Sequence, residues 1–150
     1  MSQWSYNKEA GFNYEILEKF EAGMELLGFE VKAIKAGKMN LAGSYVGVRG
    51  DEAFLIGASI TPYQVKNTPE YYEPTRTRKL LLNKKELTVL ANFESKKGLT
   101  IIPISVYNKG RHIKLEVAVA RGKKRFDKRQ TIKKRETERE MRRTLKTRYE

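Results

Sequence analysis

The sequence predicts a mainly β domain, most simply an antiparallel closed barrel of about six strands, followed by a basic C-terminal tail. Residues 14–26 alternate between apolar and polar side chains, as in a strand with one buried face. Two apolar stretches of strand length, 99–107 and 112–120, end the domain. A closed barrel exposes no sheet edge and is therefore the simplest solution. A β-sandwich is the alternative, because strand count does not separate the two folds.

The first half of the chain supplies one long strand, one helix and one hairpin. Residues 1–12 are assigned to an N-terminal extension, and residues 13–120 to the domain. Val31 and Ile34 stand one helical turn apart and Gly37 suits a left-handed cap, which predicts a short helix after Gly28. Strands over 41–49 and 52–60 flank Gly50-Asp51, a signal for a type II′ hairpin. In the first strand we expect the apolar residues at even positions to face one core: Tyr14, Ile16, Phe20, Ala22, Met24 and Leu26.

The second half begins with a long loop, marked by three prolines between 62 and 74. Asn83 with Glu86 three residues later predicts a capped helix that Gly98 ends. The two final strands, 99–107 and 112–120, follow, joined by a turn over 108–111. The sum is five or six antiparallel strands with two or three short peripheral helices.

The last thirty residues, 121–150, form a basic tail. They hold fourteen Lys and Arg against five Asp and Glu, a net charge of +9 out of +13 for the whole chain. High charge with few apolar groups predicts a tail that is disordered when free and ordered by a polyanion, of which nucleic acid is the commonest. A tail that only aids solubility is the alternative. Met141, Leu145 and Tyr149 form one helical stripe, so we expect a helix that is conditional on phosphate.

Catalytic chemistry has little support in the sequence. There is no cysteine, which excludes thiol catalysis and Cys-type metal sites. His112 is the only histidine, no G-x-S-x-G motif accompanies it, and a lone histidine at a strand start is more often a surface residue than a catalytic base. The acidic residues are scattered, and no Gly-rich phosphate loop occurs. We expect no enzyme, no cofactor and no metal. The sequence has no membrane-length apolar run, which predicts a cytoplasmic protein without a membrane partner.

Binding has more support, first in the basic segment 74–79. Arg76, Arg78 and Lys79 lie beside the capped helix, and an extended run would project both arginines to one side, spaced for phosphates. The alternative is a solvated loop in which the arginines pair with Glu70 or Glu73.

Four strings occur in order along the chain: 20–23 with Phe-Glu-Ala-Gly, 30–38 with Glu-Val-Lys and Ala-Gly-Lys, 74–83 ending in Arg-Lys-Leu-Leu-Leu-Asn, and 122–129 ending in Asp-Lys-Arg. Together they resemble the SsrA-binding protein family, small protein B (SmpB), from Asn7 onward. The resemblance implies an oligonucleotide-binding-like barrel with a tail that becomes helical on the ribosome. It also implies a role in trans-translation as the partner of transfer-messenger RNA.

The resemblance further implies partners and sites. The partners are the tRNA-like domain of transfer-messenger RNA, the decoding centre and mRNA channel of the small ribosomal subunit, and elongation factor Tu on the same RNA. The chain departs from the family's pattern at Glu9, Tyr72 and Phe126. The RNA-binding set predicted from the strings and the basic segment is Glu21, Lys32, Arg76, Arg78, Lys79, Leu81, Asn83, Lys123 and Lys124. The tail set for the decoding centre is Phe126, Asp127, Lys128, Arg129, Met141, Leu145 and Lys146.

Two other functions are open to a chain of this composition. A general single-stranded RNA binder or RNA chaperone predicts similar affinity for unstructured RNA and for a tRNA-like fold. An RNA-modifying enzyme predicts product formation that depends on His112 or on a carboxylate pair.

Overall fold

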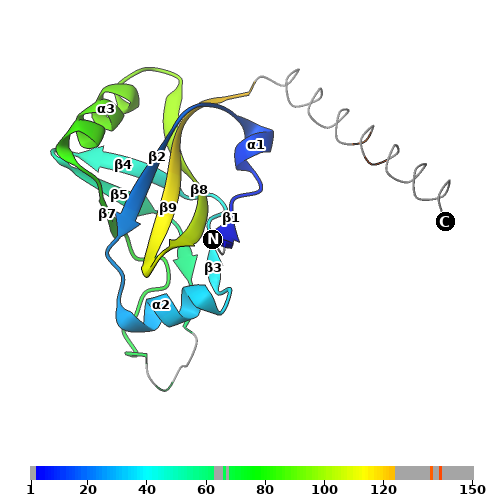
Figure 1. The fold of residues 1–150 in the computed structure, drawn as a ribbon, viewed down its shortest axis with the longest axis vertical. Coiled ribbons are helices and arrows are strands. Elements are labelled where there is room, and N and C mark those ends of the chain that lie inside the picture. Colours follow the sequence, from blue (N-terminus) through cyan, green and yellow to red (C-terminus); the bar gives the residue numbers. More distant parts are fainter. Residues whose placement is uncertain (1–2, 63–65, 67, 124–135, 137–138, 140–150) are drawn as a thin grey trace.

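The computed structural model describes residues 3–62, 66, 68–123, 136 and 139. Nearly all of the basic tail therefore lies outside the described residues, and so does its predicted conditional helix. The described chain is mainly β, with three helices (Figure 1). Its elements in order are β1 (Gln3–Tyr6), α1 (Ala10–Asn13), β2 (Tyr14–Met24), α2 (Gly28–Lys35), β3 (Met39–Asn40), β4 (Tyr45–Arg49), β5 (Glu52–Ile56), β6 (Ser59–Ile60), β7 (Arg78–Leu81), α3 (Lys84–Glu94), β8 (Leu99–Lys109) and β9 (His112–Gly122).

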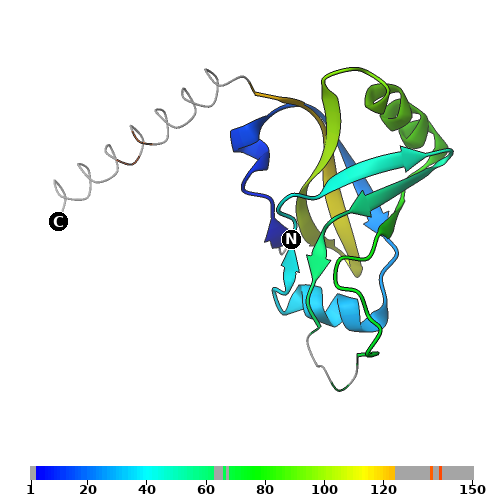
Figure 2. The ribbon, with the colours of Figure 1, turned by 180° about the vertical axis from the view of Figure 1, so that it is seen from behind.

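Six strands form a ring in which every neighbouring pair is antiparallel. The order is β8, β4, β5, β7, β2 and β9, and β9 pairs with β8 again to complete the ring. The sheet thus returns on itself, whereas a sandwich would need two separate packed sheets. β1 pairs with Ser105–Tyr107 of β8, beyond the stretch at Ile101 that pairs with β4, and β3 and β6 form a two-stranded sheet of their own (Figure 2). Part of the expected N-terminal extension therefore belongs to the sheet.

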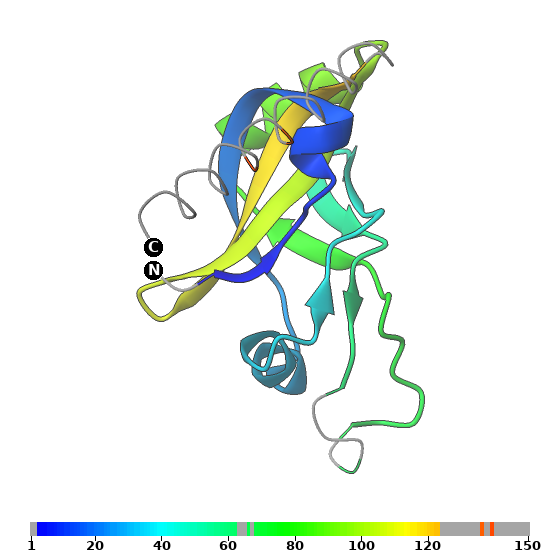
Figure 3. The same cartoon turned by 90° about the vertical axis from the view of Figure 1, so that its right-hand side faces the viewer.

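The main core lies inside the ring. Its fully buried members include Ala22, Leu55, Ile101, Leu115 and Val117, which come from five-residue or longer strands on different sides of the ring. Figures 1 and 3 place α3 at one end of the ring and α2 at the other. Each helix contributes buried side chains to the same core: Leu90 from α3, and Ala33 and Ile34 from α2.

A β-bulge divides β2 into two parts that bury opposite faces. The pairing with β9 passes from Ile16–Ala120 to Glu18–Val119, which leaves Leu17 without a partner in the register. One extra residue reverses the faces of a strand. Phe20 therefore packs on the main core, whereas Tyr14 and Ile16 pack on a second, outer cluster made by Ala10, Ile102, Ile104, Ala118 and Ala120. The expectation that all even positions face one core is wrong for this reason.

Two predicted strands are shorter than expected, and one turn is tighter. The strand expected over 41–49 begins at Tyr45, and the strand expected over 52–60 ends at Ile56. Gly57 has a φ of +86°, which takes the chain out of the extended region and separates β5 from β6. The turn expected over 108–111 contains only residues 110 and 111, between β8 and β9.

The hairpin turn, the left-handed cap at Gly37 and the cap at Asn83 are confirmed, whereas α3 ends at Glu94, before the predicted end at Gly98. Gly50 has a φ of +63°, and no described residue other than glycine has a positive φ, as a type II′ turn requires at Gly50-Asp51. The Asn83 side chain accepts a hydrogen bond from the Glu86 amide at 2.8 Å, and the Glu86 side chain accepts one from the Asn83 amide at 3.3 Å. This capping box sets the first turn of α3 beside the end of β7.

Candidate nucleic-acid interface

A groove on the outer surface gathers four of the predicted RNA-binding residues: Glu21, Lys79, Leu81 and Asn83. They come from β2, β7 and the N-cap of α3. The ring thus brings Glu21 to the same groove as Asn83, which lies 62 residues later in the sequence. We call it the β7 groove. It is lined by Glu21, Asp51, Glu52, residues 79–83, Glu86, Leu87 and Lys114.

Lys114 is the residue that sequence reasoning missed. It lies on β9 directly opposite Gly23 of β2, and it lines the β7 groove together with Glu21. The signal was available in the alternation of β9, because Ile113 and Leu115 pack on the core and the position between them must face outward. Only the pairing of β9 with β2 could place that outward lysine beside Glu21.

Glu21 is held in place by two neighbours on β8. The Tyr107 hydroxyl donates a hydrogen bond to one carboxylate oxygen, and the Lys109 ammonium contacts the other at 3.1 Å. The hydrogen bonds from Tyr107 and then Lys109 lower the pKa of Glu21. Burial and the bond to Glu21 raise the pKa of Tyr107, so its hydroxyl stays protonated and donates. The carboxylate is thus ionised and oriented as an acceptor on a partly exposed surface.

Leu81 forms an apolar ridge in the floor of the groove. Leu81 is 49% exposed, because it follows the buried Leu80 in β7 and successive strand residues point to opposite faces. Gly23 lies opposite it in the register of β2 with β7, and a Cβ at Gly23 would come within 3.3 Å of the Leu81 Cβ. The glycine therefore permits the close approach that fixes this leucine, and the ridge presents apolar surface to whatever occupies the groove.

The side-chain oxygen of Asn83 is used within the protein, whereas its side-chain nitrogen can bind a partner. The carbonyl oxygen accepts the capping hydrogen bond from Glu86. In the part of the chain that the structure describes, no partner is found for the amide nitrogen. The side chain therefore offers two N–H donors to the groove.

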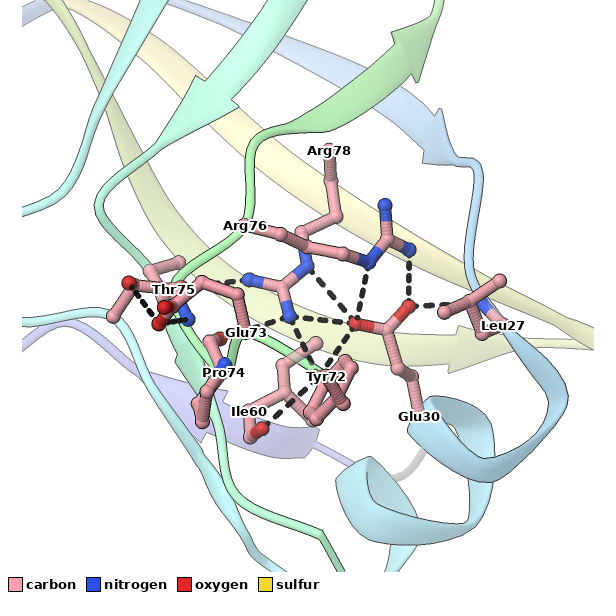
Figure 4. A network of polar contacts seen from close by, with 10 residues as sticks. Leu27, Glu30, Ile60, Tyr72, Glu73, Pro74, Thr75, Arg76 and Arg78 are labelled. Atoms are coloured by element: carbon pink, nitrogen blue, oxygen red, sulfur yellow. Dashed lines mark hydrogen bonds and ion pairs between the residues drawn. The ribbon is translucent and has the colours of Figure 1, made fainter. Parts of the chain in front are cut away.

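Arg76 and Arg78 point to one side, as predicted, but they point toward the carboxylate of Glu30 (Figure 4). The Arg78 side chain is 0% exposed, and it donates to Glu30 at 2.6 and 3.1 Å and to the carbonyl oxygens of Ala58 and Pro74. A guanidinium buried in this way cannot reach phosphate. The prediction that Arg78 contacts RNA is therefore wrong, and the partner is neither Glu70 nor Glu73.

The Glu30 cluster ties α2 to the loop before β7. Besides the two arginines, the Leu27 amide and the Tyr72 hydroxyl both donate to the Glu30 carboxylate, at 2.8 Å each. Burial raises the pKa of Glu30, but the hydrogen bonds from Arg76, Leu27, Arg78 and Tyr72 outweigh it and lower the pKa to about 2. Burial and the neighbouring carboxylate raise the pKa of Tyr72 to about 12.

The remaining basic residues of the predicted set lie apart from the β7 groove. Lys32 is on the exposed side of α2 and does not line the groove. Lys123 follows β9 and donates to the Gly11 carbonyl oxygen at 2.8 Å. Nine residues of strand separate it from Lys114, or roughly 30 Å at about 3.4 Å per residue. Lys124 and the predicted tail residues, from Phe126 to Lys146, lie outside the described residues.

The described part of the chain shows neither a metal-binding cluster nor a membrane-spanning helix. No group of three or more His, Asp or Glu side chains that could hold a metal ion occurs there. None of its helices is both long enough and apolar enough to span a bilayer.

Comparison with known proteins gives consistent matches. Residues 4–147 match the family model described as "SmpB protein". The chain is 49% identical over 143 residues to the "SsrA-binding protein" of Magnetococcus marinus, with 95% of each chain covered. It is 47% identical over 140 residues to that of Microcystis aeruginosa, covering 93% of this chain and 91% of the relative. A solved structure described as "tmRNA-SmpB: a journey to the center of the bacterial ribosome" has a chain that matches with a TM-score of 0.67 and 41% identity, over 80% of this chain and 84% of that chain.

Proposed function

Because the chain belongs to the SmpB, or SsrA-binding protein, family, we propose that it is the RNA-binding adaptor of trans-translation. It binds the tRNA-like domain of transfer-messenger RNA and brings this RNA to ribosomes that have stalled. The observation that carries the proposal is the meeting of Glu21, Leu81 and Asn83 in one groove. All three belong to the RNA-binding set that the sequence predicts.

The β7 groove has the chemistry for recognising folded RNA. The Glu21 carboxylate accepts hydrogen bonds from ribose hydroxyls and base amino groups, and the Asn83 amide donates to base or ribose oxygens. Leu81 packs against a base or a ribose face, and Lys114 neutralises a nearby phosphate. An array of this kind recognises shape and backbone, and it needs no set of side chains that identifies successive bases.

The ring of six strands serves as an oligonucleotide-binding-like barrel in this proposal, and α2 and α3 close its ends. The protein works in the cytoplasm beside the ribosome and carries out no chemistry of its own. Elongation factor Tu is carried on the same RNA. The basic tail enters the vacant mRNA channel, becomes helical against ribosomal phosphate, and places Asp127, Lys128 and Arg129 at the decoding centre.

A variant of the tail tests this division of labour. In the full chain, Asp127→Ala, Lys128→Ala and Arg129→Ala are combined, and Glu21→Gln serves as the matched groove variant. We expect the tail variant to bind the isolated tRNA-like domain within about twofold of the unmodified protein, but to lose tagging of stalled products. Glu21→Gln should weaken RNA binding itself, by about 1–3 kcal/mol if a buried polar contact is lost. Effects in the opposite order would refute the proposal.

A further inference from the structure

A second groove adjoins the β7 groove, between α2 and the turn that joins β8 to β9. Figure 3 shows the β8–β9 hairpin projecting beyond the ring on the side of the molecule where α2 lies. We call this the α2 groove. Leu81 and Lys114 line both grooves, so the two meet along the leucine ridge. The α2 groove is lined by Gly23, Met24, Leu26, Val31, Lys35, Leu81, Arg111, His112, Ile113 and Lys114.

The two grooves differ in charge. Among the described residues, the lining of the α2 groove includes Lys35, Arg111 and Lys114 and no Asp or Glu. The lining of the β7 groove includes four carboxylates beside two lysines. Like charges repel, so an RNA phosphate is favoured in the α2 groove and disfavoured next to the carboxylates of the β7 groove.

The basic side chains of the α2 groove are also available to bind a phosphate. Among the described residues, Lys35, Arg111 and Lys114 take part in no ion pair, whereas Lys79 is paired with Glu52 and Lys109 with Glu21. Lys35 and Arg111 are exposed, and they come from the two opposite walls, α2 and the hairpin turn. A phosphate between them gains two contacts without breaking an existing pair.

We propose that the α2 groove binds the sugar–phosphate backbone of the folded RNA, with Lys35 and Arg111 as phosphate contacts on its two walls. The inference rests on the proposed function and adds the path that the RNA backbone follows across the protein surface. The backbone crosses the α2 groove, passes the Leu81 ridge, and presents a base or ribose edge to Glu21 and Asn83 in the β7 groove. Met24 and Ile113 give the floor an apolar surface for the sugar.

The test is the salt dependence of RNA binding. The full chain carrying Lys35→Gln and Arg111→Gln is titrated with the isolated tRNA-like domain at a series of KCl concentrations. Each phosphate contact contributes about 0.9 to the slope of log affinity against log salt. We therefore expect the slope to become shallower by about two, and the affinity near 0.15 M salt to fall by roughly 30-fold. Both side chains are exposed, so thermal unfolding should be unchanged.

The matched control is Lys8→Gln with Lys97→Gln, which removes the same charge from two exposed lysines that line neither groove. A slope that stays unchanged in the groove variant, or one that changes equally in the control, would overturn the inference. Failure of the proposed function looks different: the unmodified protein would then bind an unstructured RNA of equal length as tightly as the tRNA-like domain.

Discussion

Glu21 and Glu30 have the same kinds of hydrogen-bond partner but differ in their exposure to solvent. Each carboxylate accepts a hydrogen bond from a tyrosine hydroxyl and from a basic side chain, and each has a lowered pKa. The Glu30 side chain is fully buried, whereas that of Glu21 is 35% exposed. The Glu30 carboxylate is enclosed by other residues of the protein, whereas Glu21 lines the β7 groove. The comparison teaches that burial decides whether such a cluster holds the fold or binds a partner.

The largest effect is expected from removing the buried carboxylate. Glu30→Ala leaves the Arg78 guanidinium buried with no counter-charge, and breaking a buried pair in this way costs about 3–5 kcal/mol of unfolding free energy. Urea denaturation of the variant and the unmodified protein measures the difference. A loss below about 1 kcal/mol would mean that water or a rotated Arg78 compensates, and that the cluster does not hold α2 to the loop.

Acid should weaken the Glu30 cluster before it affects the rest of the ring. The pKa of Glu30 falls from 4.5 to about 2 on folding, so its stabilisation is fully present above pH 4.5 and is lost as the pH drops toward 2. A shift of this size corresponds to a stability change on the order of 3 kcal/mol. Urea midpoints between pH 6 and pH 3 should therefore fall more steeply in the unmodified protein than in Glu30→Gln. Parallel lines for the two proteins would contradict the assignment.

A smaller effect is expected at the rim of the β7 groove. Asn83→Asp keeps the oxygen that caps α3, because aspartate is as good a cap as asparagine, but it replaces the amide donors by negative charge. We expect the unfolding free energy to stay within about 0.5 kcal/mol while the affinity for the tRNA-like domain falls at least tenfold. Asn83→Ala is the companion variant, and it should lose about 1 kcal/mol of stability as well. Equal affinity in Asn83→Asp and the unmodified protein would show that the amide does not donate to RNA.

The local features of the fold could be predicted from the sequence, and the exceptions have a common physical cause. The cap at Asn83 and the turn at Gly50 depend on neighbouring residues, and the structure confirms both. The bulge at Leu17 could not be predicted, because the pairing of β2 with β9 creates it.

The site shows the same limit. Glu21, Leu81 and Asn83 came from the resemblance, and the ring brings them together. Lys114 was missed and Arg78 was placed wrongly, since both positions depend on contacts with segments distant in the sequence: β2 for Lys114 and Glu30 of α2 for Arg78. Basic residues in an extended run look alike in sequence whether they face solvent or a buried carboxylate such as Glu30.

The most direct measurement is the affinity of Glu21→Gln and Glu30→Gln for the isolated tRNA-like domain, taken side by side with their unfolding free energies. Both substitutions remove one charge and keep the shape of the side chain. Glu21→Gln should weaken RNA binding about tenfold or more and leave stability nearly unchanged. Glu30→Gln should lower stability by several kcal/mol and leave the affinity of the folded protein within about threefold. Loss of affinity in Glu30→Gln alone, with Glu21→Gln unaffected, would contradict the division between the cluster that holds the fold and the cluster that binds RNA.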